Sequence, residues 1–416
     1  MEDKRIKRQN IYKVIMLVIL TATITFMLTT MIMYNKFVTS YSSIGIKTNT
    51  DGTSSISTSD LVKTLETFKT MIKQKYIGEV DEEKMVEGAI KGFVEGLGDP
   101  YTEYLPKAEM TEFTEETSSQ YVGIGVYLTN DKSTNTILVV GTMEGSPALE
   151  AGMQAGDIIE KVNGVAYTGE TMDEAIKVLK GEEGSSAEVT VLRDGKEIDL
   201  TVTRKKITVE HVSSKMVENN IAYIQVDSFD SGVAESFKKQ VTELISQGAK
   251  GIIIDLRSNG GGIVDEATGI ADLFLKKGET ILITKSKTAN EQLTVSKNDA
   301  TIQDIPVVIL VNEGTASASE ILAGALKDKH PNTTIVGMKT YGKGVIQTLY
   351  SLSDGSGLKI TTEEYYTPNH NKINKEGITP DIEVDLTKNA DGKYETEFDK
   401  DAQVKKAIET IKTKMK

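Results

Sequence analysis

The chain has 416 residues, more than one domain usually holds, which predicts two or three domains. Its formal net charge of −13 argues against a nucleic-acid partner, because no cationic surplus is available to meet phosphate groups. Since cysteine is absent from the sequence, a disulfide scaffold, a thiol nucleophile and a thiolate metal site are excluded. The three histidines are His211, His330 and His370, and we interpret them as non-catalytic, the last two as solvated. No metal or cofactor is expected.

The N-terminal region has the opposite charge to the rest of the chain. Residues 1–13 carry +3 and the remainder carries −16. The uncharged segment 14–34 would form a helix of about 30 Å, the hydrocarbon thickness of a bilayer. A cleavable signal peptide would have a shorter apolar core and a small-x-small cleavage site. The sequence therefore predicts a cytoplasmic tip at 1–13, a single-pass anchor in the cell membrane at 14–34, and an extracytoplasmic body. A buried core helix is the less favoured alternative.

A polar linker and a helical region are predicted next. Residues 39–59 hold 12 Ser or Thr in 21 positions, too polar to bury a core, so we assign 35–59 as a linker. Apolar residues then recur at helical spacing, with Ser59-Asp60 as a plausible cap, and a second helix is expected at about 82–97. Together they define a helical region at 60–112.

Residues 113–205 are expected to form a β-rich domain. Short β-type runs surround one amphipathic helix at 172–180, and Asn163-Gly164 marks a hairpin turn. This order, with the loop Gly123-Ile124-Gly125-Val126, resembles a PDZ domain. The resemblance implies that the loop turns its N–H groups toward the terminal carboxylate of a peptide, which adds as a strand. A β-rich domain without a ligand is the alternative.

From residue 206 to 416, short apolar β runs alternate with helical patterns, which predicts a βαβ sheet covered by helices. Chemistry is expected at the carboxyl ends of its strands. Three loops stand there, at residues 257–262, 312–320 and 337–344. The third nearly matches a phosphate-binding loop, but Gly344 replaces the magnesium-binding hydroxyl and a strand, not a helix, is expected to follow. The sequence of this loop therefore argues against nucleotide binding.

The second loop offers two serines. Ser317 and Glu320 have the spacing of a capping box, so Ser317 could simply begin a helix. Alternatively it is a nucleophile, and Ser319 competes for that role. Neither the G-x-S-x-G elbow of α/β-hydrolases nor the HExxH pattern of zinc proteases occurs in the sequence.

Three motifs follow the PDZ-like region in order: DLRSNGGG, NEGTASASEILAGALKD and VGMKTYGKGVIQ. They resemble those of the carboxyl-terminal processing protease family, and the resemblance covers residues 60–416. It implies a multi-domain α/β protein in which the PDZ domain precedes a crotonase/ClpP-like α/β protease core with a C-terminal helix. The family's activity implies a serine endopeptidase that cleaves protein substrates at or near their C-termini. The PDZ domain would bind C-terminal tails and gate activity, and a homodimer is the assembly that family precedent suggests.

The motifs also imply roles for individual residues. Ser317 would be the nucleophile, Lys343 the general base and Gln347 the residue that orients the lysine. A serine hydroxyl needs an adjacent base, and a lysine can serve only if burial lowers its pKa from about 10.4 toward 7. If 343 to 347 form one strand, alternation places both ends on the same face.

The oxyanion would bind to the backbone N–H of Ala318 and to that of Gly261 or Gly262. The choice between these glycines stays open, because Gly260 replaces the proline that many members carry. Two further hypotheses compete with a protease: a catalytically silent PDZ adaptor on a protease-like scaffold, and a non-hydrolytic binding protein of the crotonase type. The joint presence of Ser317, Lys343 and Gln347 favours the protease.

Overall fold

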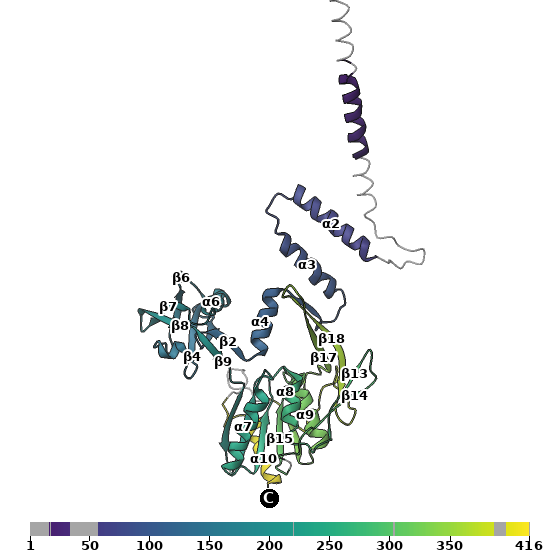
Figure 1. Ribbon diagram of the computed structural model, residues 1–416. Helices are drawn as coiled ribbons and strands as arrows, with labels where there is room; N and C mark the ends of the chain where they lie inside the picture. Colours follow the sequence, from purple (N-terminus) through teal and green to yellow (C-terminus); the bar gives the residue numbers. More distant parts are fainter. Residues whose placement is uncertain are drawn as a thin grey trace, which may run out of the picture. The chain divides into compact units, whose positions relative to one another are not determined.

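The computed structural model describes residues 16, 18–33, 57–218, 220–302, 304–386 and 397–415. The chain divides into two compact units, Met1–Ala89 and Ile90–Lys416, shown in Figure 1. In the first unit, residues 16 and 18–33 are helical and exposed. Across the described ranges, no helix has both the length and the apolar character that crossing a bilayer requires. The expected anchor lies partly outside these ranges, at 14, 15, 17 and 34, as do the expected tip and all but the last three residues of the expected linker.

Helix α2 (Thr58–Lys75) begins earlier than expected, because Ser57 is its N-cap and accepts a hydrogen bond from the Asp60 N–H. No side chain of α2 is buried, and five of its apolar residues form an exposed stripe. The residues of this stripe are Val62, Leu65, Phe68, Met71 and Ile72. Helix α3 (Glu82–Glu95) follows, and its first residue pairs with Lys69 and Lys73.

The β-rich segment is built on one antiparallel sheet with the order β3-β4-β5-β7-β8. Its elements are β3 (Val126–Asp131), β4 (Thr136–Thr142), α5 (Pro147–Glu150), β5 (Ile158–Val162), β6 (Val165–Ala166), η1 (Gly169–Thr171), α6 (Met172–Leu179), β7 (Ser186–Arg193) and β8 (Lys196–Thr203). Alternate residues of β7, Ala187, Val189 and Val191, point into the core. A separate ribbon, β2 (Gln120–Gly123) with β9 (Lys205–Thr208), stands at the two ends of the segment.

The C-terminal region is a six-stranded sheet with the order β10-β11-β12-β15-β16-β19. Its strands are β10 (Val212–Val217), β11 (Ile221–Val226), β12 (Gly251–Asp255), β15 (Val307–Val311), β16 (Thr333–Gly337) and β19 (Ile382–Glu383), and all pair in parallel except β10 with β11. Alternate residues bury opposite faces: Ile252 and Ile254 join one core and Ile253 the other. The first core contains side chains of α7 (Val233–Ser246), α8 (Val264–Ala271) and α9 (Ala318–Lys329), and the second those of α10 (Ala402–Lys414).

A second sheet of this region contains both the N-terminal strand β1 and the strand that follows the loop at 337–344. It has the order β1-β18-β13-β14, and β17 also pairs with β18. The strands are β1 (Glu103–Leu105), β13 (Thr280–Ser286), β14 (Gln292–Val295), β17 (Val345–Ser351) and β18 (Gly357–Tyr366), and α4 (Lys107–Thr117) follows β1. Because β17 directly follows the glycine-rich loop 341–344, the strand predicted there is confirmed and no phosphate-binding helix begins at that point.

Candidate active site

Ser317 lies between β15 and α9, at the carboxyl end of a buried strand as predicted. It is the N-cap of α9 and has a positive φ of 56°, a conformation that non-glycine residues adopt at a cost of about 1–3 kcal/mol. Ser317 is partly exposed, whereas Ser319 is fully buried. The Ser319 hydroxyl donates to the carbonyl of Asn259 at 3.0 Å. Of the two serines that the sequence left open, Ser319 therefore holds the glycine loop in place and Ser317 is the one accessible to a substrate.

The buried carboxylate of Glu320 joins the serine motif to the lysine motif. Its Oε2 accepts from the backbone N–H groups of Ser317 and Lys343, each at 2.9 Å. Its Oε1 accepts from Thr340 Oγ1 at 2.5 Å and from the Gly342 N–H at 2.8 Å. Burial raises the pKa of Glu320, and these four donors oppose that shift. The capping box predicted for Ser317 and Glu320 is present, but Glu320 does more than cap a helix, because it fixes both motifs.

A second link between the motifs comes from Tyr365 of β18, which is 1% exposed. Its single hydroxyl proton is shared between two acceptors, the carbonyl oxygen of Lys343 at 2.6 Å and that of Ser317 at 3.1 Å. Burial raises the pKa of Tyr365 well above its usual value, so the group stays a donor. Nothing in the sequence marks this tyrosine, because its role depends on β18 crossing both loops.

Lys343 is half-buried in the loop that precedes β17. Its Nζ lies 4.8 Å from the centroid of the Tyr101 ring. Burial, together with the nearby Lys359, lowers the pKa of Lys343, while Asp99 and Glu103 act in the opposite direction. A lowered pKa is what a lysine needs to act as a general base near neutral pH.

Gln347 lies within β17, and its position differs from the simple strand geometry. Lys343 precedes the strand, and a β-bulge between Ile346 and Gln347 interrupts the alternation of side chains. Alternation along a strand therefore does not place the side chains of Lys343 and Gln347 on the same face. Instead, Gln347 Nε2 donates to Thr361 Oγ1 at 3.1 Å.

The glycine loop after β12 lies directly against the serine. A Cβ added at Gly261 would stand 2.8 Å from Ser317 Cβ and 2.9 Å from Ala318 N, so only glycine permits this approach. The Gly261 N–H already donates to Asn259 Oδ1 at 2.8 Å. In the described part of the chain, no acceptor is found for the N–H of Gly262 or of Ala318. Of the three N–H groups that the sequence offered for an oxyanion, those of Gly262 and Ala318 are therefore without an acceptor among the described residues, whereas that of Gly261 has one.

The loop expected to bind peptides precedes β3, which is an edge strand of its sheet. Gly125 has a φ of 73°, and a Cβ there would stand 2.5 Å from Ser146 Cβ. Ile124 is buried, and its carbonyl accepts from the Ala148 N–H at 2.8 Å. Gly123 ends β2 and Val126 begins β3, so one side of β3 is left open to an added strand.

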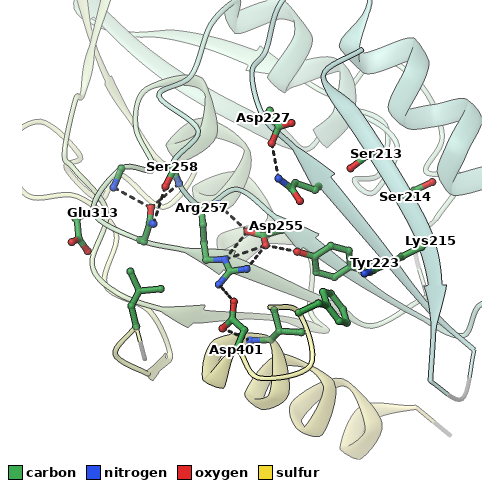
Figure 2. A pocket seen from close by; sticks show the side chains of 16 residues that line it. Ser213, Ser214, Lys215, Tyr223, Asp227, Asp255, Arg257, Ser258, Glu313 and Asp401 are labelled. Atoms are coloured by element: carbon green, nitrogen blue, oxygen red, sulfur yellow. Dashed lines mark hydrogen bonds and ion pairs between the residues drawn. The ribbon is translucent and has the colours of Figure 1, made fainter. Parts of the chain in front are cut away.

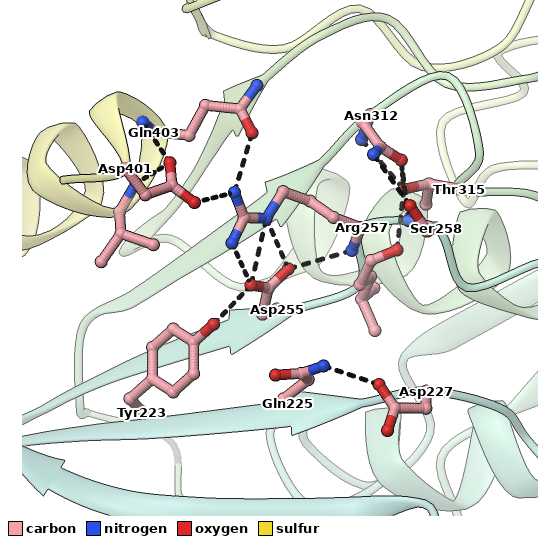
Figure 3. Close-up of polar contacts among 12 residues, drawn as sticks. Tyr223, Gln225, Asp227, Asp255, Arg257, Ser258, Asn312, Thr315, Asp401 and Gln403 are labelled. Carbon is pink, nitrogen blue, oxygen red and sulfur yellow. Dashed lines mark hydrogen bonds and ion pairs between the residues drawn. The ribbon is translucent and has the colours of Figure 1, made fainter. Parts of the chain in front are cut away.

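A cleft of about 940 Å³ lies on the side of the six-stranded sheet that α10 covers (Figure 2). Its lining includes neither Ser317 nor Lys343. Within it, Arg257 donates to Asp255 at 2.6 Å and to Asp401 at 2.5 Å, and Tyr223 donates to Asp255 at 2.5 Å (Figure 3). Asp401 is the N-cap of α10. The network thus anchors the C-terminal helix to the loop that carries Gly261 and Gly262, and its charged groups pair with one another.

One histidine differs from expectation. His330 is 2% exposed, its Nδ1 lies 2.9 Å from Thr333 Oγ1, and its ring contacts Phe274 edge-on. The prediction that His330 is solvated is therefore wrong, because the loop after α9 folds back onto the core. His370 is exposed, and His211 lies 3.2 Å from Asp230.

Comparison with known proteins gives three matching family models: peptidase family S41 over residues 220–384, a PDZ domain over 138–193, and the activating protease CtpB N-terminal domain over 18–109. The chain is 37% identical over 316 residues to the carboxy-terminal processing protease CtpA of Bacillus subtilis, covering 76% of this chain and 67% of the relative. It is 38% identical over 326 residues to a probable CtpA-like serine protease of Staphylococcus aureus, covering 78% of this chain and 65% of that protein.

The fold agrees with these matches. A Bacteroides fragilis protein assigned to the S41 proteases superposes with a TM-score of 0.52 at 16% identity, covering 81% of this chain and 92% of that one. The mixed α/β architecture with a PDZ domain and an S41 core is thereby confirmed. The chain belongs to the carboxyl-terminal processing proteases of peptidase family S41 and is a serine-type peptidase.

Proposed function

We propose that the protein is a membrane-anchored endopeptidase that cleaves protein substrates at or near their C-termini, with Ser317 as nucleophile and Lys343 as general base. The observation that carries this proposal is the double link between the two residues: the Glu320 carboxylate binds both backbone N–H groups and the Tyr365 hydroxyl binds both carbonyls. The two loops are thus held together at Ser317, the more accessible of the two serines of its motif.

The chemistry follows from these positions. Lys343 in its neutral form accepts the Ser317 hydroxyl proton as Oγ attacks the scissile carbonyl carbon, and the N–H groups of Gly262 and Ala318 stabilise the oxyanion. The ammonium of Lys343 then protonates the leaving amine, and water hydrolyses the acyl-enzyme by the same route in reverse. Gln347 supports the lysine through its hydrogen bond to Thr361.

The PDZ segment and the N-terminal region complete the proposal. The open edge of β3 and the loop at Gly123, Ile124, Gly125 and Val126 would bind C-terminal tails and gate activity. The uncharged run at 14–35 and its basic flank support an anchor with the body outside the cytoplasm. The exposed apolar stripe of α2 supports a homodimer, since a lone helix rarely leaves such a stripe in water. The domain boundaries at 1–13, 14–34, 35–59, 60–112, 113–205 and 206–416 remain part of this proposal.

The test measures casein cleavage by the purified full chain. Ser317→Ala and Lys343→Ala should each abolish cleavage, whereas Ser319→Ala should retain the reactive serine in an active-site titration with a fluorophosphonate. Cleavage that survives either of the first two substitutions would refute the dyad. An intact fold without activity in the wild type, but with peptide-tail binding, would favour the silent adaptor.

A further inference from the structure

The surroundings of the Lys343 amine come largely from outside the protease motifs. The Tyr101 ring lies 4.8 Å from its Nζ, and the charges of Asp99 and Glu103 act on it. These residues belong to β1 and to the turn before it, which the family model of the S41 peptidase, beginning at residue 220, does not include. The antiparallel pairing of β1 with β18 places Glu103 opposite Lys359 and so brings this segment to the site.

The carboxylate of Asp99 is held rigidly in the turn. Thr102 Oγ1 donates to its Oδ2 at 2.6 Å and the Tyr101 N–H donates to its Oδ1 at 3.3 Å. Thr102 is buried, and its Oγ1 accepts from the backbone N–H of Thr361 at 3.0 Å. The turn is therefore fastened to β18 at the residue that also contacts Gln347.

Thr361 connects Gln347 to this carboxylate. Its hydroxyl accepts from Gln347 Nε2 at 3.1 Å and hydrogen-bonds to Asp99. A hydroxyl can accept one hydrogen bond while it donates another. Hydrogen bonds of this kind, with Thr102 as well as Thr361, keep the pKa of Asp99 low although burial alone would raise it, so the carboxylate is charged where it faces Lys343.

We propose that Tyr101 and Asp99 are positioning residues for Lys343, which hold its amine by the ring face and by opposite charge, and that Thr361 transmits the orientation of Gln347 to them. This inference rests on the proposed function, in which Lys343 is the general base. It gives the segment before the PDZ domain a part in positioning the general base.

Opposing influences act on the amine. Burial and Lys359 favour its neutral form, whereas Asp99, Glu103 and the Tyr101 ring favour the ammonium. Glu103 is paired with Lys359 and is exposed, which weakens its effect. Removing the Asp99 charge should therefore make the lysine lose its proton at lower pH.

The experiment measures kcat and kcat/KM of the full chain against pH with a fluorogenic peptide, per titrated active serine. In Asp99→Asn, the acid limb of kcat/KM should move to lower pH. Tyr101→Leu keeps an apolar side chain over the amine but removes the ring. In this variant the acid limb should also move to lower pH, and the plateau kcat should fall about twofold to thirtyfold, which corresponds to the loss of a cation–ring contact. Tyr101→Phe should restore both values.

Matched substitutions at exposed sites, Asp399→Asn and Tyr350→Leu, should move neither the limb nor the plateau. An unmoved limb in Asp99→Asn, or equal kinetics for the leucine and phenylalanine variants, would overturn the inference while leaving the dyad intact. Activity that survives in Lys343→Ala would instead refute the proposed function. A separate check uses Thr361→Val. If Gln347 acts through the Thr361 hydroxyl, adding Gln347→Ala to the Thr361→Val variant should not move the acid limb of kcat/KM any further.

Discussion

The hydroxyl of Tyr365 offers the sharpest test of how the two loops that carry the proposed catalytic residues are held. Tyr365→Phe removes one oxygen from a fully buried ring and leaves the packing of that ring unchanged. The change removes the one hydroxyl proton that is shared between the Lys343 carbonyl at 2.6 Å and the Ser317 carbonyl at 3.1 Å. The two losses are not equal, because the Ser317 carbonyl also accepts from the Glu320 and Ile321 N–H groups.

The magnitude follows from this difference. A buried carbonyl left without its donor costs about 1–3 kcal/mol, and a carbonyl that keeps other donors loses less than about 1 kcal/mol. We therefore expect Tyr365→Phe to lower the free energy of unfolding by about 2 kcal/mol. The effect on catalysis should be larger, since a displacement near 1 Å at a reacting group can reduce the rate about 100-fold.

The assay combines urea unfolding with kcat on a fluorogenic peptide. Tyr366→Phe is the matched control: it is the adjacent residue, and its hydroxyl donates to Glu364 at 2.7 Å in a partly exposed position. The control should change stability by less than about 0.5 kcal/mol and leave kcat unaffected. If Tyr365→Phe matched this control in both measurements, the bridging role would be refuted.

Three further predictions address other contacts. Glu320→Gln replaces one acceptor oxygen by an amide that faces two donors, so kcat should fall at least tenfold while peptide-tail binding is retained, as calorimetry would show. Gly125→Ala combines a positive φ with a 2.5 Å contact to Ser146 and should abolish tail binding, although hydrolysis of a short peptide should persist. The third concerns Asp157, whose pKa is lowered because hydrogen bonds to Arg193 and the Gln154 N–H outweigh burial. Its stabilisation is present above the unfolded value of about 3.9 and is lost as pH falls through the folded value, so Asp157→Asn should flatten acid unfolding measured by circular dichroism.

Much of the core architecture could be predicted because its signals are local. The continuous β runs at 251–255 and 307–311 are buried on both faces of the sheet, and such runs have few other interpretations. The strand after Gly344 was likewise predictable, and it decided against a phosphate site. The position of Ser317 at the carboxyl end of a strand followed from the same pattern.

The contacts of Lys343 could not be predicted, because they come from distant segments. Tyr101 precedes it by more than two hundred residues, and only the pairing of β1 with β18 brings the two together. The bulge at Gln347 also has no clear sequence signal, and it redirects that side chain to Thr361. The burial of His330 could not be predicted for the same reason, since burial of a loop residue depends on what folds over it.

The sequence by itself indicated the class of chemistry. The absence of cysteine excludes a thiol nucleophile, and three motifs in the order of the carboxyl-terminal processing proteases indicated a serine peptidase and the residues proposed for its dyad. The tertiary structure decided how these residues are held, because the hydrogen bonds that Glu320 accepts and Tyr365 donates join two separate loops only once β18 and α9 are packed together. It also separated Ser317 from Ser319, since exposure is a property of the folded chain and not of the spacing.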